Sequence, residues 1–251
     1  MVKMFFLILT GACLFSGCSV KKVEENKSGY ILLPGYFYPT EDAWKYVFSA
    51  PSDVLKIVVV NPCGGPLDCD GNLDYKYKEF IKALDDNGKL PVGYVYTDYG
   101  NRDILEVEND IDIWIEEYPE IKGFFIDEVT RTEDNVAYYK ELVAYINEWS
   151  EITGNSYFIV LNPGTNPDDV YFSIADLVVI FEHDFSSFKS DSCYSSYPEK
   201  SVCIVYDANE TEMEEVFSSS NVAYYYITDD TLPFPYDSLP SYLDKEIEFL
   251  R

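Results

Sequence analysis

The sequence predicts an α/β protein built as a single (β/α)8 TIM barrel. Eight short apolar runs recur along the chain, and amphipathic helical patterns separate most of them. The runs lack the alternation of polar and apolar residues found in half-exposed strands, so they indicate parallel strands covered on both faces. The chain has 251 residues, close to the typical barrel length of about 250. An open doubly wound sheet is the alternative, but no G-x-G-x-x-G motif follows the first run to indicate dinucleotide binding.

Each predicted strand is a short run of β-branched and aromatic residues. In chain order the runs are residues 30–39, 56–62, 91–97, 123–129, 157–163, 177–183, 202–207 and 222–229. Helical spacing of apolar residues occurs between them at 75–88, 104–118, 134–153, 210–217 and 238–250. In the first of these helices, Phe80, Ile81 and Leu84 share one face and Gly88 offers a C-cap. The link after the sixth run is rich in loop residues, and its helix is left open.

The chain before the first predicted strand has the pattern of a targeting segment. Residues 1–17 contain one lysine, an apolar run at 4–14 and small residues before Cys18. The run is too short for a bilayer, which takes roughly 20 residues, so it predicts a cleaved signal peptide. The letters LFSGC resemble a bacterial lipobox, which implies that Cys18 is lipidated and becomes the mature N-terminus. An ordinary secretory signal is the alternative.

Three segments follow along the chain. Residues 1–17 are the predicted lipoprotein signal peptide, residues 18–29 are the lipidated cysteine and its tether, and residues 30–251 are the barrel domain. The tether is charged and lacks apolar periodicity. We therefore expect an exported monomer that the lipid anchor alone holds on the bacterial cell envelope, at the membrane or outer membrane.

The chain is strongly acidic, with 45 aspartates and glutamates against 18 lysines and arginines and a formal charge of −27. Its 16 Phe, 3 Trp and 23 Tyr supply enough apolar surface to offset the entropy cost of folding, which excludes intrinsic disorder. A nucleic acid duplex carries a phosphate charge about every 1.7 Å and would be repelled. The charge instead favours neutral or cationic ligands.

Four cysteines remain after Cys13 leaves with the signal and Cys18 is lipidated. Cys63 and Cys69 flank a glycine-rich loop, and Cys193 and Cys203 flank a loop rich in serine and tyrosine. In an exported chain these spacings predict two local disulfides. Zinc binding is the alternative, but neither pair has the close spacing of a structural zinc site.

Polar residues close most of the predicted strands. Because the active site of a (β/α)8 barrel lies at the C-terminal ends of its strands, these residues are candidates for function. They are Tyr36, Tyr38, Asn61, Tyr96, Thr97, Asp98, Asp127, Glu128, Asn162, Glu182, His183, Asp207 and Asp229. Ordinary turn formation is the alternative for the asparagines and the last two aspartates. Asp127, Glu128 and Glu182 directly follow apolar residues, where a carboxylate is costly unless it has a function or, alternatively, a structural ion pair.

Paired carboxylates in an exported, aromatic-rich barrel point to glycoside hydrolysis. In that reaction one acid protonates the leaving oxygen and the other acts as nucleophile or base. Tyr36, Tyr38, Tyr94, Tyr96 and Tyr99 could offer ring faces to sugars, with packing between barrel and helices as the alternative. The sequence places no Ser/His or Cys/His pair for nucleophilic catalysis and contains one histidine, so we expect neither a metal nor another cofactor.

Several strings together resemble the spherulation-specific family 4, or spherulin-4-like, proteins. They are YFYPTEDAW, VVVNPCGGP, VGYVYTDYGNR, IDIWIEEYPEIKGFFIDEV, VLNPGTNPDDVY and VVIFE. The resemblance implies a TIM-barrel glycoside hydrolase related to fungal endo-α-1,4-N-acetylgalactosaminidases that cut galactosaminogalactan. It also implies that Asp127, Glu128 and Glu182 are the functional acids. The chain departs from the fungal pattern in its inserted Cys63 and Cys69 and in Cys193 after the sixth strand, in loops that would line or flank the substrate groove.

The mechanistic hypothesis takes Asp127 as nucleophile, Glu182 as acid/base and Glu128 as a residue that orients substrate. Adjacent strand residues point to opposite faces, so the roles of Asp127 and Glu128 are exchangeable at this stage. The predicted substrate-binding residues are Tyr36, Tyr38, Asn61, Tyr96, Asp98, Tyr99, Arg102, Asn162 and Asp207. The alternative is a non-catalytic glycan-binding or surface-assembly lipoprotein. An isomerase or aldolase would require a strand-end lysine or a metal cluster, and neither is visible.

Overall fold

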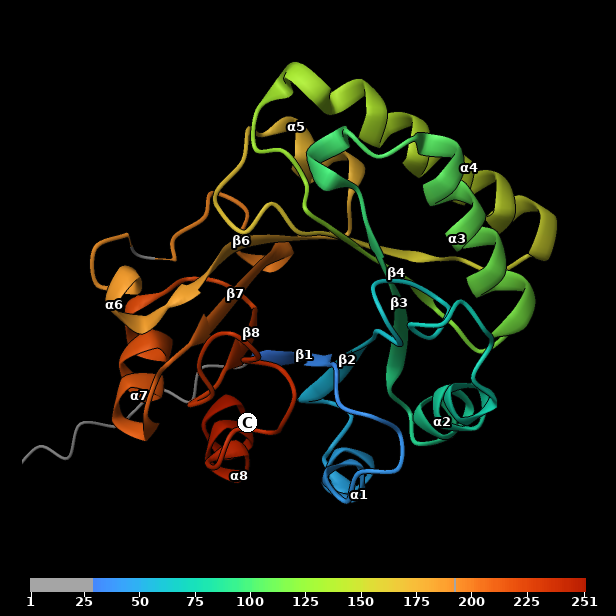
Figure 1. Cartoon of the computed structure of the whole chain (residues 1–251). Coiled ribbons are helices and arrows are strands. Elements are labelled where there is room, and N and C mark those ends of the chain that lie inside the picture. The colour runs from blue at the N-terminus through green and yellow to red at the C-terminus, as the bar shows by residue number, and fades with distance from the viewer. Residues whose placement is uncertain (1–28, 192) are drawn as a thin grey trace, which may run out of the picture.

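The computed structural model describes residues 29–191 and 193–251 (Figure 1). Eight parallel strands form a closed barrel in which each strand pairs with its neighbours in chain order, and β8 pairs with β1. This closure confirms the single (β/α)8 barrel and excludes the open sheet. The predicted signal peptide, Cys18 and nearly all of the tether lie outside the described residues.

The strands occupy the eight predicted runs but are shorter than several of them. They are β1 (Tyr30–Gly35), β2 (Leu55–Val60), β3 (Leu90–Tyr96), β4 (Gly123–Asp127), β5 (Phe158–Leu161), β6 (Leu177–Asp184), β7 (Ser201–Tyr206) and β8 (Tyr224–Ile227). Their residues are almost all buried, as expected of strands that have the barrel interior on one face and helices on the other. Because β1 ends at Gly35 and β4 ends at Asp127, the polar residues that follow belong to the loops at the barrel mouth.

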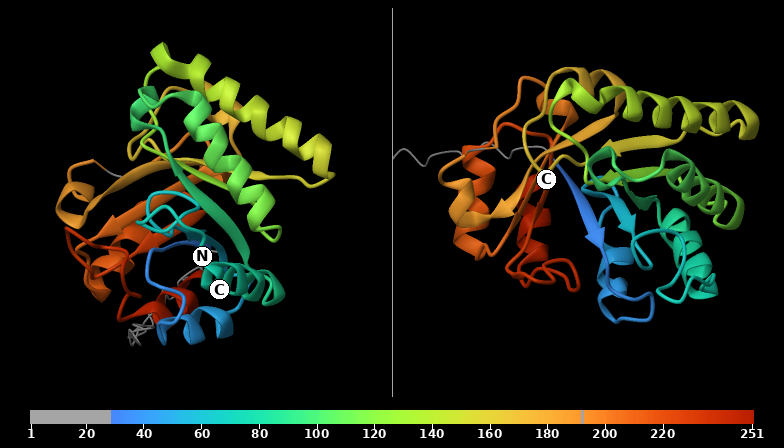
Figure 2. Two further views of the ribbon diagram at one scale, coloured as in Figure 1. Left: turned by 45° about the vertical axis from the view of Figure 1, so that its right-hand side comes forward. Right: turned by 45° about the horizontal axis from the view of Figure 1, so that its top comes forward.

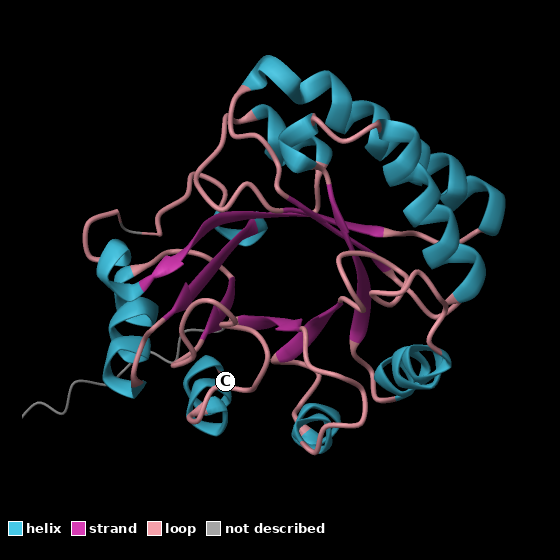
Figure 3. Cartoon of the chain, in the orientation of Figure 1, coloured by secondary structure: helices cyan, strands magenta, loops and turns pink. Residues whose placement is uncertain are grey.

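The helices form a ring around the strands (Figures 2 and 3). They are α1 (Ala43–Ser49), α2 (Tyr75–Asp86), α3 (Ile104–Glu117), α4 (Val136–Thr153), α5 (Val170–Ile174), α6 (Phe185–Phe188), α7 (Glu210–Ser219) and α8 (Leu243–Leu250). All five predicted helices are present, and the described part of the loop-rich link after β6 contains the single-turn α6 and a 3₁₀ turn at Pro198–Lys200. Gly88 takes a left-handed φ of 71° one residue after the α2 C-cap, Asn87. Within the described part of the chain, no helix is sufficiently long and apolar to cross a membrane.

Close packing between α3 and β3 fixes the position of Tyr94. A Cβ atom added to Gly93 would lie 2.6 Å from the Trp114 ring, so only glycine admits the indole at this point. The Trp114 Nε1 group donates a hydrogen bond of 3.0 Å to the Tyr94 carbonyl oxygen. The backbone that presents the Tyr94 side chain to the barrel mouth is therefore held by a buried helix contact.

Glu246 of α8 is buried completely, with an exposed fraction of 0%. Neither of its carboxyl oxygens has a well-formed hydrogen bond to the described residues. Burial raises its pKa to about 8, against the smaller opposing effect of the Ile227 backbone. The fold therefore favours the neutral carboxylic acid at this position.

Candidate active site

The carboxyl ends of β4, β5 and β6 bring two acids and one amide together. Asn162 Nδ2 donates hydrogen bonds of 2.7 Å to Asp127 Oδ1 and 2.6 Å to Glu182 Oε2. The two facing carboxylate oxygens therefore cannot lie farther apart than the sum of these distances. The Gly164 amide donates to Asn162 Oδ1 at 3.0 Å, which turns the Asn162 NH₂ group towards the acids.

Two tyrosine hydroxyls contact the outer oxygens of the same pair. Tyr94 donates to Asp127 Oδ2 at 2.6 Å, and Tyr236 donates to Glu182 Oε1 at 2.6 Å. The ring of Tyr36 lies between these tyrosines and meets both edge-on, with ring centroids 5.8 Å from Tyr94 and 5.6 Å from Tyr236. Both oxygens of each acid thus accept a hydrogen bond, and the side chains that donate them are fixed by packing.

The environment of the two acids raises both of their pKa values. Burial is the main cause for each, and the negative charge of Asp127 raises the pKa of Glu182 further. The hydrogen bonds from Tyr94, Asn162 and Tyr236 act in the opposite direction because they stabilise the ionised forms. A pair of this kind retains a proton at a higher pH than isolated carboxyls would, which allows one acid to donate a proton while the other is ionised.

Glu128 turns away from this pair. The strand ends at Asp127, and Glu128 adopts a left-handed φ of 54°. Its carboxylate accepts a hydrogen bond of 3.2 Å from the Asp98 amide, on the loop after β3. Burial and the Asp127 charge raise the Glu128 pKa. The sequence left Asp127 and Glu128 interchangeable, whereas the geometry places Asp127 alone of the two on the Asn162 bridge.

Residues with strained backbone conformations lie at the same rim of the barrel. Among the described residues other than glycine, the positive φ values are those of Asp98, Tyr99, Glu128 and Asp207, at 47°, 53°, 54° and 55°. Such conformations cost of order 1–3 kcal/mol each and persist only where surrounding contacts impose them. Their concentration at the ends of β3, β4 and β7 is typical of a functional site.

The remaining predicted sugar-binding residues divide into two groups. Asn61 accepts a hydrogen bond from the Gly64 amide at 2.6 Å, and Tyr38 donates to Asp74 at 2.6 Å. Arg102 forms an ion pair of 2.7 Å with Asp110, and its guanidinium lies 4.3 Å from the centre of the Tyr96 ring. These residues have local structural partners. Tyr96, Asp98, Tyr99 and Asp207 are exposed at the rim, and sugar binding by any of these residues stays a prediction.

Sequence reasoning missed Tyr236 and the cavity beside it. The cavity has a volume of about 420 Å³ and is lined by Tyr36, Glu182, Tyr206 and residues 232–237. Tyr236 lies in the loop well after β8, so no strand end points to it. The signal in the sequence is the string LPFPYD, in which two aromatic residues alternate with two prolines. The sequence predicts only a sugar-facing ring for Tyr94, whereas in the structure its hydroxyl donates a hydrogen bond to Asp127.

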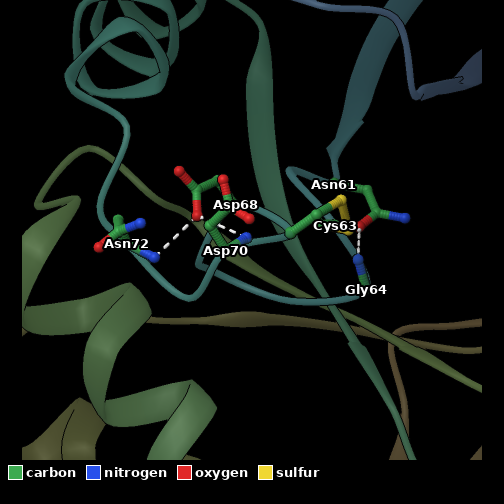
Figure 4. The surroundings of a disulfide bond; sticks show 7 residues. Asn61, Cys63, Gly64, Asp68, Asp70 and Asn72 are labelled. Carbon is green, nitrogen blue, oxygen red and sulfur yellow. Dashed lines mark hydrogen bonds between the residues drawn. A yellow bond between two sulfur atoms is a disulfide. The ribbon is translucent and has the colours of Figure 1, made fainter.

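One of the two predicted disulfides is present. Cys63 and Cys69 form a disulfide, and the same loop is closed by Asp68, whose side chain accepts hydrogen bonds from the Asp70 and Asn72 amides (Figure 4). The predicted disulfide between Cys193 and Cys203 is wrong. Cys203 is buried in the middle of β7, where the strand sets the direction of its side chain, while Cys193 lies on the link from α6. Sequence spacing alone does not determine whether two cysteines reach the Cβ geometry that a disulfide requires.

In residues 29–191 and 193–251, no group of three or more histidine, cysteine or acidic side chains is placed to hold a metal ion. The chemistry available at the mouth is proton transfer and nucleophilic attack by carboxyl groups.

Known proteins with similar sequences and structures support the observed fold and show the family of the chain. Residues 30–250 match the spherulation-specific family 4. Spherulin-4 of Physarum polycephalum is 31% identical over 233 residues, which cover 86% of this chain and 68% of that protein. The crystal structure of Aspergillus clavatus Sph3 in complex with GalNAc has the same fold, with a TM-score of 0.72 at 24% identity, over 89% of this chain and 97% of that one. The chain therefore belongs to the spherulation-specific family 4.

Proposed function

We propose that the protein is an exported glycosidase that cleaves an amino-sugar polysaccharide of the galactosaminogalactan type, acting within the chain on α-1,4-linked N-acetylgalactosamine units. The observation that carries this proposal is the Asn162 bridge, which holds two carboxyl groups of raised pKa face to face at the barrel mouth. Family membership and the GalNAc bound to Aspergillus clavatus Sph3 support an amino sugar as substrate. The net charge of −27 is compatible with a polymer that carries some free, positively charged amino groups.

In the proposed reaction Asp127 attacks the anomeric carbon of the sugar. The glycosidic C–O bond breaks, its electron pair stays with the leaving oxygen, and that oxygen takes the proton of Glu182. Water then attacks the anomeric carbon and gives a proton to Glu182, while the ester bond to Asp127 breaks and regenerates its carboxylate. Tyr94 and the Glu128 amide, which both donate to Asp127, orient the nucleophile. Glu128 itself would orient the substrate at the rim.

The spacing of the acids supports retention of anomeric configuration. Retaining enzymes place their two carboxyl groups about 5–5.5 Å apart, and inverting enzymes about 6.5–9.5 Å apart to admit a water molecule. Asn162 holds one oxygen of each acid within hydrogen-bonding distance of a single nitrogen. These two oxygens therefore lie no farther apart than the sum of the two distances, which is compatible with the shorter spacing of retaining enzymes.

The experiment that tests this function is incubation of the purified protein with a panel of amino-sugar polymers that differ in linkage and acetylation. We expect new reducing ends from α-1,4-linked galactosaminoglycans and shorter chains among the products. Binding of the polymer without new reducing ends would support a non-catalytic glycan-binding protein instead.

Asn162 should control both the rate and the pH dependence of this reaction. Asn162→Ala removes two hydrogen bonds, one to each acid, that lower the pKa values of Asp127 and Glu182, so both pKa values rise. We expect kcat/KM to fall about 10²-fold, the effect typical of losing one well-placed donor, and both limbs of the pH profile to move to higher pH. A pH series of initial rates measures this, with Asn221→Ala as the control far from the mouth. A lower rate with unmoved limbs would contradict the role of the bridge.

The lipid anchor is a separate proposal, made from the LFSGC string. Cys18→Ser in the full-length chain should move the protein from the membrane fraction to the soluble exported fraction and abolish labelling by a fatty-acid probe. Cys13→Ser is the matched control and should change neither result. Continued labelling of the Cys18→Ser variant would exclude this cysteine as the lipidation site.

A further inference from the structure

Glu182 separates two regions of the barrel mouth. Its Oε2 atom accepts the hydrogen bond of Asn162, which also contacts Asp127, while its Oε1 atom accepts the hydrogen bond of Tyr236. The cavity of about 420 Å³ lies on the Tyr236 side. Glu182 belongs to its lining, whereas Asp127 does not. The cavity therefore borders Glu182 directly, while Asp127 is not part of its lining.

The wall of this cavity is formed by the loop after β8. Leu232 and Phe234 are 63% and 68% exposed, although both are large and apolar, and Pro233 and Pro235 flank Phe234. The aromatic residues Tyr36 and Tyr206 also line the cavity. Exposed apolar side chains that rim a concave site beside catalytic groups are typical of a ligand contact surface.

We propose that this cavity is the subsite for the sugar unit on the leaving-group side of the cleaved bond. This inference rests on the proposed function, in which Glu182 protonates the leaving oxygen. The acid must contact that oxygen, so the sugar attached to it lies beside the acid, while the sugar that is attacked lies beside Asp127. A cavity that touches Glu182 and not Asp127 fits the leaving sugar.

The lining also indicates the chemistry of that sugar. Leu232, Phe234 and the two prolines offer carbon surface to the apolar face of a pyranose ring and to the methyl group of an acetamido substituent. The side chains of Glu182 and Asp237 also line the cavity and can accept hydrogen bonds from sugar hydroxyls and from the N–H of an acetamido group. The combination of an apolar wall and these acceptors favours an N-acetylated sugar in this subsite.

Two substrates distinguish the two sides of the cleaved bond. An α-1,4-linked N-acetylgalactosamine oligosaccharide has a leaving sugar, whereas α-N-acetylgalactosaminyl fluoride releases only fluoride and needs no proton from the acid. We expect Phe234→Ala and Leu232→Ala each to lower kcat/KM about 10-fold or more for the oligosaccharide. Neither change should alter kcat/KM for the fluoride.

Control variants make each outcome informative. Leu105→Ala removes an equally exposed side chain from α3 and should change neither rate. Asp127→Asn should abolish both rates, which verifies that the fluoride reports on the same site. Equal losses on both substrates, or no loss on either, in the Phe234 and Leu232 variants would overturn the subsite while leaving the proposed function intact. A wild-type protein that hydrolyses neither substrate would defeat the proposed function and the subsite with it.

Discussion

Asp127→Asn should reduce hydrolysis of an amino-sugar polymer by about 10⁴-fold or more, the scale of loss when a covalent nucleophile is removed. The amide keeps the size of the side chain but cannot form the glycosyl ester. Glu182→Gln should reduce hydrolysis about 10²–10⁴-fold, because it removes general acid and base catalysis. Release of reducing ends measures both effects.

The matched controls are Asp86→Asn, on the exposed face of α2, and Glu248→Gln, on the exposed face of α8. Both repeat the chemical change outside the barrel mouth, and both should retain wild-type rates. Thermal unfolding of all four variants separates a lost function from a lost fold. Wild-type hydrolysis in the Asp127 and Glu182 variants would contradict the proposed roles.

Glu246→Gln should stabilise the protein strongly at alkaline pH and little at acidic pH. The folded pKa of about 8 exceeds the ordinary value of 4.5, so the fold favours the protonated form. The free energy of unfolding of the wild type therefore falls as pH rises from about 4.5 through 8, by on the order of 4–5 kcal/mol. Glutamine carries no charge at any of these pH values and avoids this loss.

Thermal unfolding at pH 5 and pH 9 tests this directly. For a chain of this size, we expect Glu246→Gln to raise the Tm by about 10 °C at pH 9 and to change it little at pH 5. Glu248→Gln, exposed two residues later on the same helix, should give no such pH-dependent difference. An equal shift at both pH values would mean that ionisation of Glu246 is not the cause.

The sequence located the acids because strand ends can be recognised from local pattern. FFI before Asp127 and VVIF before Glu182 mark buried strands, and in a closed parallel barrel all such ends meet at one mouth. Because the barrel is closed, residues that end different strands lie at the same mouth, so a residue's place at a strand end predicts its place in the fold. Predicting that the acids lie at the mouth required only the number of strands, their pattern of burial and their parallel arrangement.

Local sequence pattern does not distinguish the roles of Asn61 and Asn162. Asn61 and Asn162 both precede proline, and each accepts a hydrogen bond from a nearby glycine amide. Both asparagines therefore take part in turn formation, as the alternative interpretation predicts. Asn162 differs because β4 and β6, on either side of β5, place an acid against each side of its free NH₂ group. Only the three-dimensional order of the strands reveals this.

Local sequence pattern also does not predict the path of a loop, as Tyr236 and the Cys193–Cys203 pair show. The loop after β8 carries Tyr236 back across the mouth to Glu182, a contact between residues 54 positions apart. Cys193 and Cys203 are close in sequence, yet the sequence does not specify how the loop from α6 enters β7. Strand pairing can be inferred from periodicity, whereas the path of an irregular loop depends on packing against distant residues.

The most direct test of the account is to trap the sugar on the enzyme. In Glu182→Gln, α-N-acetylgalactosaminyl fluoride should still react with Asp127, because fluoride leaves without a proton, but water attack should be slow because the base is missing. Peptide mass spectrometry should then find one N-acetylhexosamine residue attached to Asp127 and none in an Asp127→Asn, Glu182→Gln double variant. Attachment to Glu128, or no attachment while wild-type protein hydrolyses the fluoride, would contradict Asp127 as the nucleophile of a retaining glycosidase.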